Sequence, residues 1–174
     1  MELLAIEIYG SEILRKHSEP VAEVTPELVE LAEKMLDTMY EAPGIGLAAP
    51  QVGKNIQLIV ADVAKEDEEP EPYIIFNPEI SFVEEDNPIV DYEEGCLSVP
   101  DIFANVQRPE FINVKGINEK GETFEMKNVG GLLSRCIQHE VDHLNGTLFV
   151  DKISAADKSI NQSKLRKMAK GQKK

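Results

Sequence analysis

The stretch QHEVDHLNG, residues 138–146, constrains this chain more than any other, because it places two histidines four residues apart around a glutamate. On a helix, His139 and His143 project from the same face one turn apart, so both rings can reach one metal ion. Glu140 lies beside them and can reach a water molecule bound there. Because the chain has only 3 histidines, a chance match is rare, and the pattern predicts two metal ligands and a base on a helix.

The third ligand is not expected downstream of this helix. In the metzincin pattern a further histidine follows the glycine by three residues, and this chain has Phe149 at that place after Gly146. No glutamate occurs after Glu140, which removes the usual alternative ligand. The third ligand should therefore come from upstream.

The upstream candidates are His17, Cys96 and Cys136. Cys136 shares the helical stripe of His139, but its short side chain leans toward the helix N-terminus, which favours an apolar thiol that lines a pocket. His17 is typical of a surface histidine. Cys96 follows Gly95, where the backbone can be approached closely, and the residues leave it open between a ligand and a buried structural cysteine. With Cys96, the site would keep one tetrahedral position free for water, as catalytic sites do.

The rest of the chain predicts one α+β domain, residues 1–174, with an N-terminal helix, antiparallel sheet around the central HExxH helix, and a C-terminal helix. Its 174 residues, 42% of them hydrophobic, suit a single core. Apolar residues recur at helical spacing from Thr25 to Pro43 and again over residues 132–144, which predicts two helices. Ser154 can cap a third helix. Strand-like runs bounded by turn residues cover residues 56–62, 73–76, 80–83, 111–114 and 123–126.

Charge divides the chain into an acidic body and a basic tail. The net charge is −14, yet residues 151–174 hold 8 Lys and Arg against 2 Asp, which leaves −20 for the rest. The body should repel DNA, whereas the tail is either a solvated helix end or an electrostatic arm. Two cysteines, no basic leader before an apolar segment and no apolar run near ~20 residues favour a soluble, cytoplasmic protein without membrane contact.

Three segments, in this order, resemble the signature motifs of the peptide deformylase family. They are GIGLAAPQ at residues 44–51, EGCLS at residues 94–98 and QHEVDH at residues 138–143. The resemblance covers most of the chain and is weakest in the acidic loop, residues 64–72, and in the last twenty residues. It implies an enzyme that removes the formyl group from the N-terminal methionine of nascent polypeptides and releases formate.

The resemblance also implies the metal site. By this resemblance, one divalent ion is bound by Cys96, His139 and His143, and the native ion is Fe(II). A thiolate and two imidazoles could also hold Zn(II), Ni(II) or Co(II), so the residues by themselves do not select the metal.

Catalytic roles follow from the same resemblance. It implies that Glu140 would act as general base and acid toward a water that the metal activates for attack on the formyl carbon. It also implies that the Gln51 amide and the Leu97 backbone N–H would stabilise the oxyanion. Two other readings keep the metal but change the activity. One is a zincin-like peptidase with a cleft on both sides of the scissile bond, and the other is a non-catalytic, metal-stabilised module that binds ribosomes.

Substrate and partner contacts are implied as well. Ile45 and Gly46 resemble a backbone edge that binds an extended peptide, and Ile45, Leu132 and Cys136 would wall a pocket for the methionine side chain. Arg135 occupies a position near this pocket that varies in the family, so the resemblance gives it no role. For the basic tail it implies a transient contact with the ribosome.

Overall fold

The computed structural model describes residues 2–172 of the chain. Within them, the polypeptide forms three α-helices, seven strands and three short 3-10 helices. The α-helices are α1 (Pro26–Glu41), α2 (Gly131–Leu144) and α3 (Ala155–Gly171), and the 3-10 helices are η1 (Glu12–Arg15), η2 (Ala49–Val52) and η3 (Phe149–Asp151). The strands are β1 (Gly46–Ala48), β2 (Leu58–Ala61), β3 (Tyr73–Phe82), β4 (Ile89–Cys96), β5 (Val99–Pro109), β6 (Ile112–Ile117) and β7 (Thr123–Val129).

A five-stranded antiparallel sheet, in the order β1-β2-β3-β6-β7, forms the larger half of the molecule. Because side chains alternate along a strand, β2 buries Leu58 and Val60 on one face and Ile59 on the other. The first face packs on α1 through Met35 and Met39. The second face packs on α2 through apolar residues that include Ile137, Val141 and Leu144.

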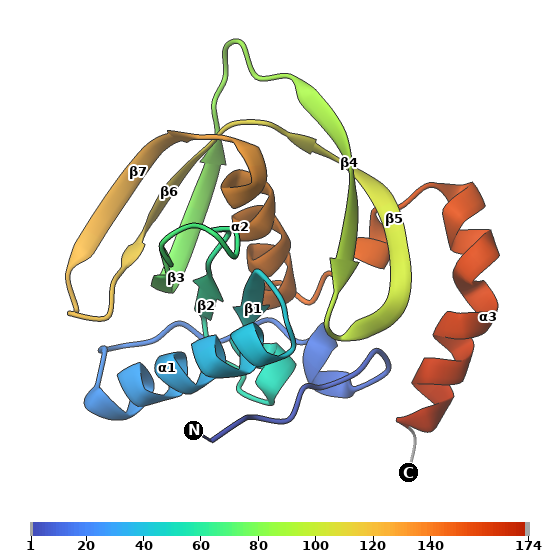
Figure 1. Cartoon of the computed structure of the whole chain (residues 1–174), viewed down its shortest axis with the longest axis horizontal. Helices are drawn as coiled ribbons and strands as arrows, with labels where there is room; N and C mark the ends of the chain where they lie inside the picture. Colours follow the sequence, from blue (N-terminus) through green and yellow to red (C-terminus); the bar gives the residue numbers. More distant parts are fainter. Residues whose placement is uncertain (1, 173–174) are drawn as a thin grey trace.

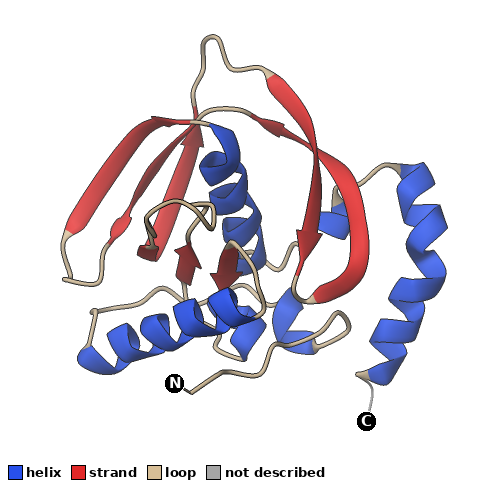
Figure 2. Cartoon of the chain, in the orientation of Figure 1, coloured by secondary structure: helices blue, strands red, loops and turns tan. Residues whose placement is uncertain are grey.

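The strands β4 and β5 form a separate two-stranded sheet. Figure 1 shows α2 standing between this hairpin and the larger sheet, with α3 along the outer side of β5. The hairpin packs on a third apolar cluster, to which Ile102 and Val106 of β5, Phe149 of η3 and Leu165 of α3 belong. The two groups of strands with the helix between them are also evident in Figure 2.

The expected α+β class and the central place of the HExxH helix are confirmed. The Thr25 side chain caps α1 by accepting from the Leu28 N–H, and Ser154 caps α3 by accepting from the Asp157 N–H. Two predicted runs, residues 73–76 and 80–83, fall in the single strand β3, which ends at Phe82, one residue before the second run does. The hairpin β4–β5 was not predicted. None of the helices in residues 2–172 is long and apolar enough to cross a membrane.

Candidate metal centre and active-site cleft

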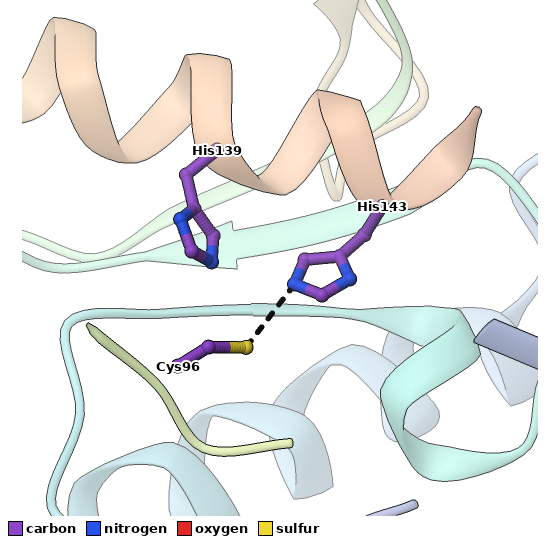
Figure 3. A group of neighbouring side chains, drawn as sticks. All are labelled: Cys96, His139 and His143. Atoms are coloured by element: carbon purple, nitrogen blue, oxygen red, sulfur yellow. Dashed lines mark hydrogen bonds between the residues drawn. The ribbon is translucent and has the colours of Figure 1, made fainter. Parts of the chain in front are cut away.

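The helix α2 presents its two histidines toward the end of β4. His139 and His143 are 8% and 1% exposed, and their ring centroids lie 5.1 Å apart. Figure 3 shows both rings projecting from the helix toward Cys96, whose Sγ lies 3.4 Å from His143 Nε2. One ligand atom from each of the three residues lies within 4.8 Å of the others. Phe149, which stands where a metzincin histidine would be, stacks beside the His139 ring at 6.0 Å.

These distances fit a tetrahedral metal ion. Sulfur and nitrogen atoms that share such an ion lie ~3.6 Å apart, close to the separation of Cys96 Sγ and His143 Nε2. His139 Nδ1 is paired with Glu94 Oε1 at 2.9 Å, which leaves Nε2 of that ring for a metal. Burial, together with nearby His139, lowers the pKa of His143 well below its usual range, so that ring is neutral, the form that ligates.

The site is rich in negative charge, which suits a cation. Burial alone would lower the pKa of His139, but Glu140, Cys96 and Glu94 outweigh it and raise the pKa well above its usual range. The carboxylates among these neighbours, which stabilise a proton on this ring, would also stabilise a divalent ion in the same place. The residues present therefore fit the metal that the sequence predicted.

Glu140 lies beside the three candidate ligands with one oxygen unpaired. The residue is 4% exposed, and its Oε1 has no hydrogen-bond partner within the part of the chain that the structure describes. Burial raises the pKa of Glu140 to about 7. Its Oε2 lies against Gly46 of β1, where a Cβ atom would come within 2.5 Å of that oxygen and 2.6 Å of Cys136 Sγ. The close approach of β1 to α2 thus depends on glycine at this position.

Gln51 is held with its amide group directed at Cys96. It lies on η2, directly after β1, and is 1% exposed. Its Oε1 accepts from the Ala48 N–H at 2.9 Å, while its Nε2 donates to Ser98 Oγ at 3.1 Å and lies 3.5 Å from Cys96 Sγ. Both ends of the amide are therefore fixed. Leu97 lies in the tight turn that joins β4 to β5.

One cleft brings together every predicted site residue except His143. Its volume is about 860 Å³, and its lining includes the partly exposed apolar side chains of Ile45 and Leu132. Burial raises the pKa of the Cys136 thiol well above its usual range, so this wall residue is neutral. His17 is exposed and lies outside the cleft. The predicted residues that line it are Ile45, Gly46, Gln51, Cys96, Leu97, Leu132, Cys136, His139 and Glu140.

A buried ionic network behind the candidate ligands was not found by sequence reasoning. The Glu94 Oε2 atom accepts from Arg108 Nε and from Arg135 Nη1, both at 2.6 Å, while its Oε1 atom accepts from Arg108 Nη2 at 2.9 Å. Arg108 also donates to Asp142 at 2.8 Å. Burial raises the pKa of Glu94, but its hydrogen bonds with Arg108 and His139 outweigh that effect and bring it to about 2. Glu94 stands in a recognised motif, yet nothing in the local sequence marks its distant partners.

Fold and site together define a metal-binding hydrolase of the HExxH type, in which a cysteine from a separate hairpin stands beside the histidine pair. The family model described as "Polypeptide deformylase" matches residues 3–159. The chain belongs to the peptide deformylase family and is an enzyme.

Relatives and solved structures agree with this assignment. A peptide deformylase of Mesorhizobium japonicum is 46% identical over 170 residues, covering 98% of this chain and 95% of that protein. The structure of the peptide deformylase from Thermus thermophilus has a TM-score of 0.88 at 35% identity and covers 98% of this chain and 100% of its own. A peptide deformylase from Synechococcus elongatus, in complex with actinonin, has a TM-score of 0.86 at 42% identity, with coverage of 92% and 87%.

Proposed function

We propose that this enzyme hydrolyses the formyl group from N-formylmethionyl peptides and releases formate. The observation that carries the proposal is the unpaired Oε1 of Glu140, buried in the cleft beside Cys96, His139 and His143. Burying a carboxylate oxygen without a partner costs free energy, and such groups are concentrated at functional sites.

The three ligands would hold one divalent ion, with Fe(II) as the native metal and Zn(II), Ni(II) or Co(II) as substitutes. When bound, such an ion lowers the pKa of water to about neutral and polarises a carbonyl oxygen. Glu94 holds the His139 ring through its Nδ1, which leaves Nε2 as the nitrogen that would bind such an ion.

Proton transfer falls to Glu140. It takes a proton from the attacking water and later gives it to the departing amine. Gln51 is oriented by Ala48 and Ser98, so its Nε2 is positioned to donate to the developing oxyanion, together with the Leu97 backbone N–H. Because these donors are fixed before substrate arrives, they need no reorganisation during the reaction.

The free edge of β1 is the proposed peptide-binding edge. Within the sheet, the Ile45 carbonyl accepts from the Asp62 N–H at 2.9 Å. Backbone groups alternate along an antiparallel strand, so the N–H and C=O of Gly46 face away from β2 and are available to an added peptide strand. The partly exposed side chains of Ile45 and Leu132, with Cys136, then wall the pocket for methionine.

Formate release from a formyl-Met-Ala-Ser peptide by Fe(II)- or Ni(II)-loaded enzyme tests the proposal. Glu140→Gln should lower kcat by ~10²–10⁴ with unchanged metal content, because only the proton carrier is lost. An acetyl-Met-Ala-Ser control should remain intact. Cleavage of an internal peptide bond instead of formate release would favour the peptidase alternative, and full activity of Glu140→Gln would refute the role of Glu140.

A second proposal concerns the ribosome. Lys164, Arg166, Lys167 and Lys170 are exposed on α3, whereas Leu165 is buried against the hairpin cluster. The helix is thus anchored by its apolar side and offers positive charge on the other, a form suited to transient binding of ribosomal RNA phosphates. This contact would keep the enzyme near emerging formylmethionyl chains.

A further inference from the structure

We propose that Arg135 is a positioning residue for the metal centre, because it holds the β4–β5 hairpin against α2. The inference rests on the metal site proposed above. The candidate ligands belong to two different parts of the fold, since Cys96 ends β4 whereas His139 and His143 lie on α2. Their mutual geometry therefore depends on what holds the hairpin to the helix.

Arg135 makes three hydrogen bonds from α2 to the hairpin. Its Nη2 donates to the Val90 carbonyl of β4 at 2.7 Å, and its Nη1 donates to the Val106 carbonyl of β5 at 2.9 Å. The third bond, from Nη1 to Glu94 Oε2, measures 2.6 Å. The Tyr92 ring of β4 lies over the guanidinium at 5.5 Å. One buried side chain on the helix thus fixes both strands of the hairpin.

Glu94 connects Arg135 to His139, one of the candidate metal ligands. Arg135 and His139 are one helical turn apart on α2, and both bond to the same carboxylate, Arg135 through Oε2 and His139 through Oε1. Arg108 occupies a further position on each of these oxygens. A carboxylate with all its acceptor positions filled has little freedom to rotate, so it holds the His139 ring in one orientation.

Arg108 cannot replace Arg135 in this role. Arg108 lies on β5 itself, and its link to the helix reaches Asp142, near the helix C-terminus. Arg135 is the group that joins the backbone of both strands to the turn before His139. A planar guanidinium can donate to three acceptors in different directions at fixed geometry, which a lysine ammonium cannot match on a flexible stem.

The test measures metal binding and needs no assay of deformylation. Wild type, Arg135→Met and Arg135→Lys are loaded with Co(II), and the dissociation of the ion into an excess of chelator is followed by absorption. We expect Arg135→Met to weaken Co(II) affinity by ~10–100-fold and to alter the thiolate and d–d bands, because Cys96 and His139 no longer keep their relative positions. Arg135→Lys should recover part of the affinity, since it retains the charge beside Glu94.

Ile137→Ala is the matched control for a loss of stability alone. Ile137 is fully buried on the same helix, but its side chain belongs to the apolar cluster of the larger sheet and cannot hydrogen-bond to Glu94. The control should lower the thermal midpoint of the metal-free protein while leaving the Co(II) spectrum and dissociation rate unchanged. If Arg135→Met does not fold, Arg135→Lys with a wild-type spectrum and rate would overturn the proposal, as would a wild-type result for Arg135→Met. Wild-type protein that fails to bind Co(II) would overturn the metal site itself.

Discussion

At the scale of single residues, the proposed chemistry depends on side chains that are held from two sides. Glu140 is confined between the candidate ligands and Gly46, and the Gln51 amide is fixed by a backbone donor at one end and Ser98 at the other. Such groups tolerate little displacement, because a shift of ~1 Å in a reacting group can cost ~10² in rate. Conservative substitutions at these positions should therefore affect activity far more than stability.

Gly46→Ala should lower kcat/KM by ~10² while the metal content stays that of wild type. The added Cβ would lie 2.5 Å from Glu140 Oε2 and 2.6 Å from Cys136 Sγ, and both side chains must move because the backbone of β1 is tied into the sheet. Steady-state formate release together with metal analysis measures both quantities. Gly171→Ala is the control, since a Cβ there meets no atom within 4 Å. Wild-type kinetics in Gly46→Ala would mean that the observed placement of Glu140 is not required.

Gln51→Met and Gln51→Glu should each lower kcat by ~10²–10³, because both remove the Nε2 donor proposed to stabilise the oxyanion. The two variants differ in what they retain: the glutamate keeps an oxygen for the Ala48 N–H, and the methionine adds no charge. A shared loss would therefore identify the donor as its cause. Ser98→Ala removes only the hydroxyl that holds the amide and should show a much smaller decrease. Equal kcat for Gln51→Met and wild type would exclude the role.

At the scale of elements, the sequence predicted the helices better than the hairpin on which Cys96 lies. The α2 pattern could be recognised because its apolar positions recur at helical spacing and its histidines share one face. In contrast, β5 alternates buried Ile102, Ala104 and Val106 with an outward-facing Phe103, and the next inward residue is Arg108. Because a large apolar residue faces outward and a cation faces inward, the alternation of apolar and polar residues that marks a strand cannot be recognised in this segment.

The register of the hairpin explains why its partners could not be found from sequence. Glu94 pairs with Ala104 but Cys96 pairs with Val99, so β5 carries three additional residues at a bulge. The residues left Cys96 open between a ligand and a buried structural cysteine, and only the motif resemblance assigned it as a ligand. Local sequence contains no sign that Glu94 would meet Arg108 and Arg135. Contacts between residues 14 and 41 positions apart depend on tertiary packing. The candidate ligands could thus be named from the sequence, whereas the network behind them could not.

One ion pair joins two short helices that are distant in the chain, and it gives a pH-dependent prediction. Arg15 of η1 donates to both oxygens of Asp151 in η3, at 2.6 and 3.2 Å. Burial raises the pKa of Asp151, but the hydrogen bonds from Arg15 and the Leu148 N–H outweigh it, so the pKa lies below the ordinary 3.8. The charged form is favoured on folding, so the pair stabilises above pH ~3.8 and is lost as pH falls further.

Asp151→Asn should therefore lower the free energy of unfolding by less than ~1 kcal/mol at pH 7, because the pair is partly exposed and screened by solvent. The difference from wild type should shrink as the pH falls below ~3.8, where wild type also loses the charge. Urea unfolding of the two metal-free proteins at several pH values measures it. Glu30→Gln, which removes only a more exposed pair with Lys34, is the control and should have a smaller effect. A difference that grows on acidification would contradict this account.

At the scale of the whole molecule, the acidic and basic segments of the chain lie in different parts of the fold. The acidic body encloses the cleft, while the basic segment forms α3 on the far side of the hairpin (Figure 1). The helix α3 is packed on the rest of the protein, because Leu165 is 6% exposed and Ala169 lies directly against Gly10. Deleting α3 would expose the cluster beneath it, so its charge is better tested by substitution than by truncation.

Replacing Lys164, Arg166, Lys167 and Lys170 together by Gln should weaken binding to ribosomes and flatten its dependence on salt, without loss of formate release from a free peptide. Each phosphate contact that is removed lowers the slope of log affinity against log salt by ~1, because fewer counterions are released on binding. Co-sedimentation with ribosomes at several salt concentrations measures that slope. Lys115→Gln with Lys127→Gln, on exposed positions of β6 and β7, controls for a general change in net charge. If this control reduces the salt-dependence slope as much per removed positive charge as the α3 variant does, the attraction to the ribosome is non-specific. If neither variant alters sedimentation, α3 serves only to cover the hairpin cluster and the proposed ribosome contact is wrong.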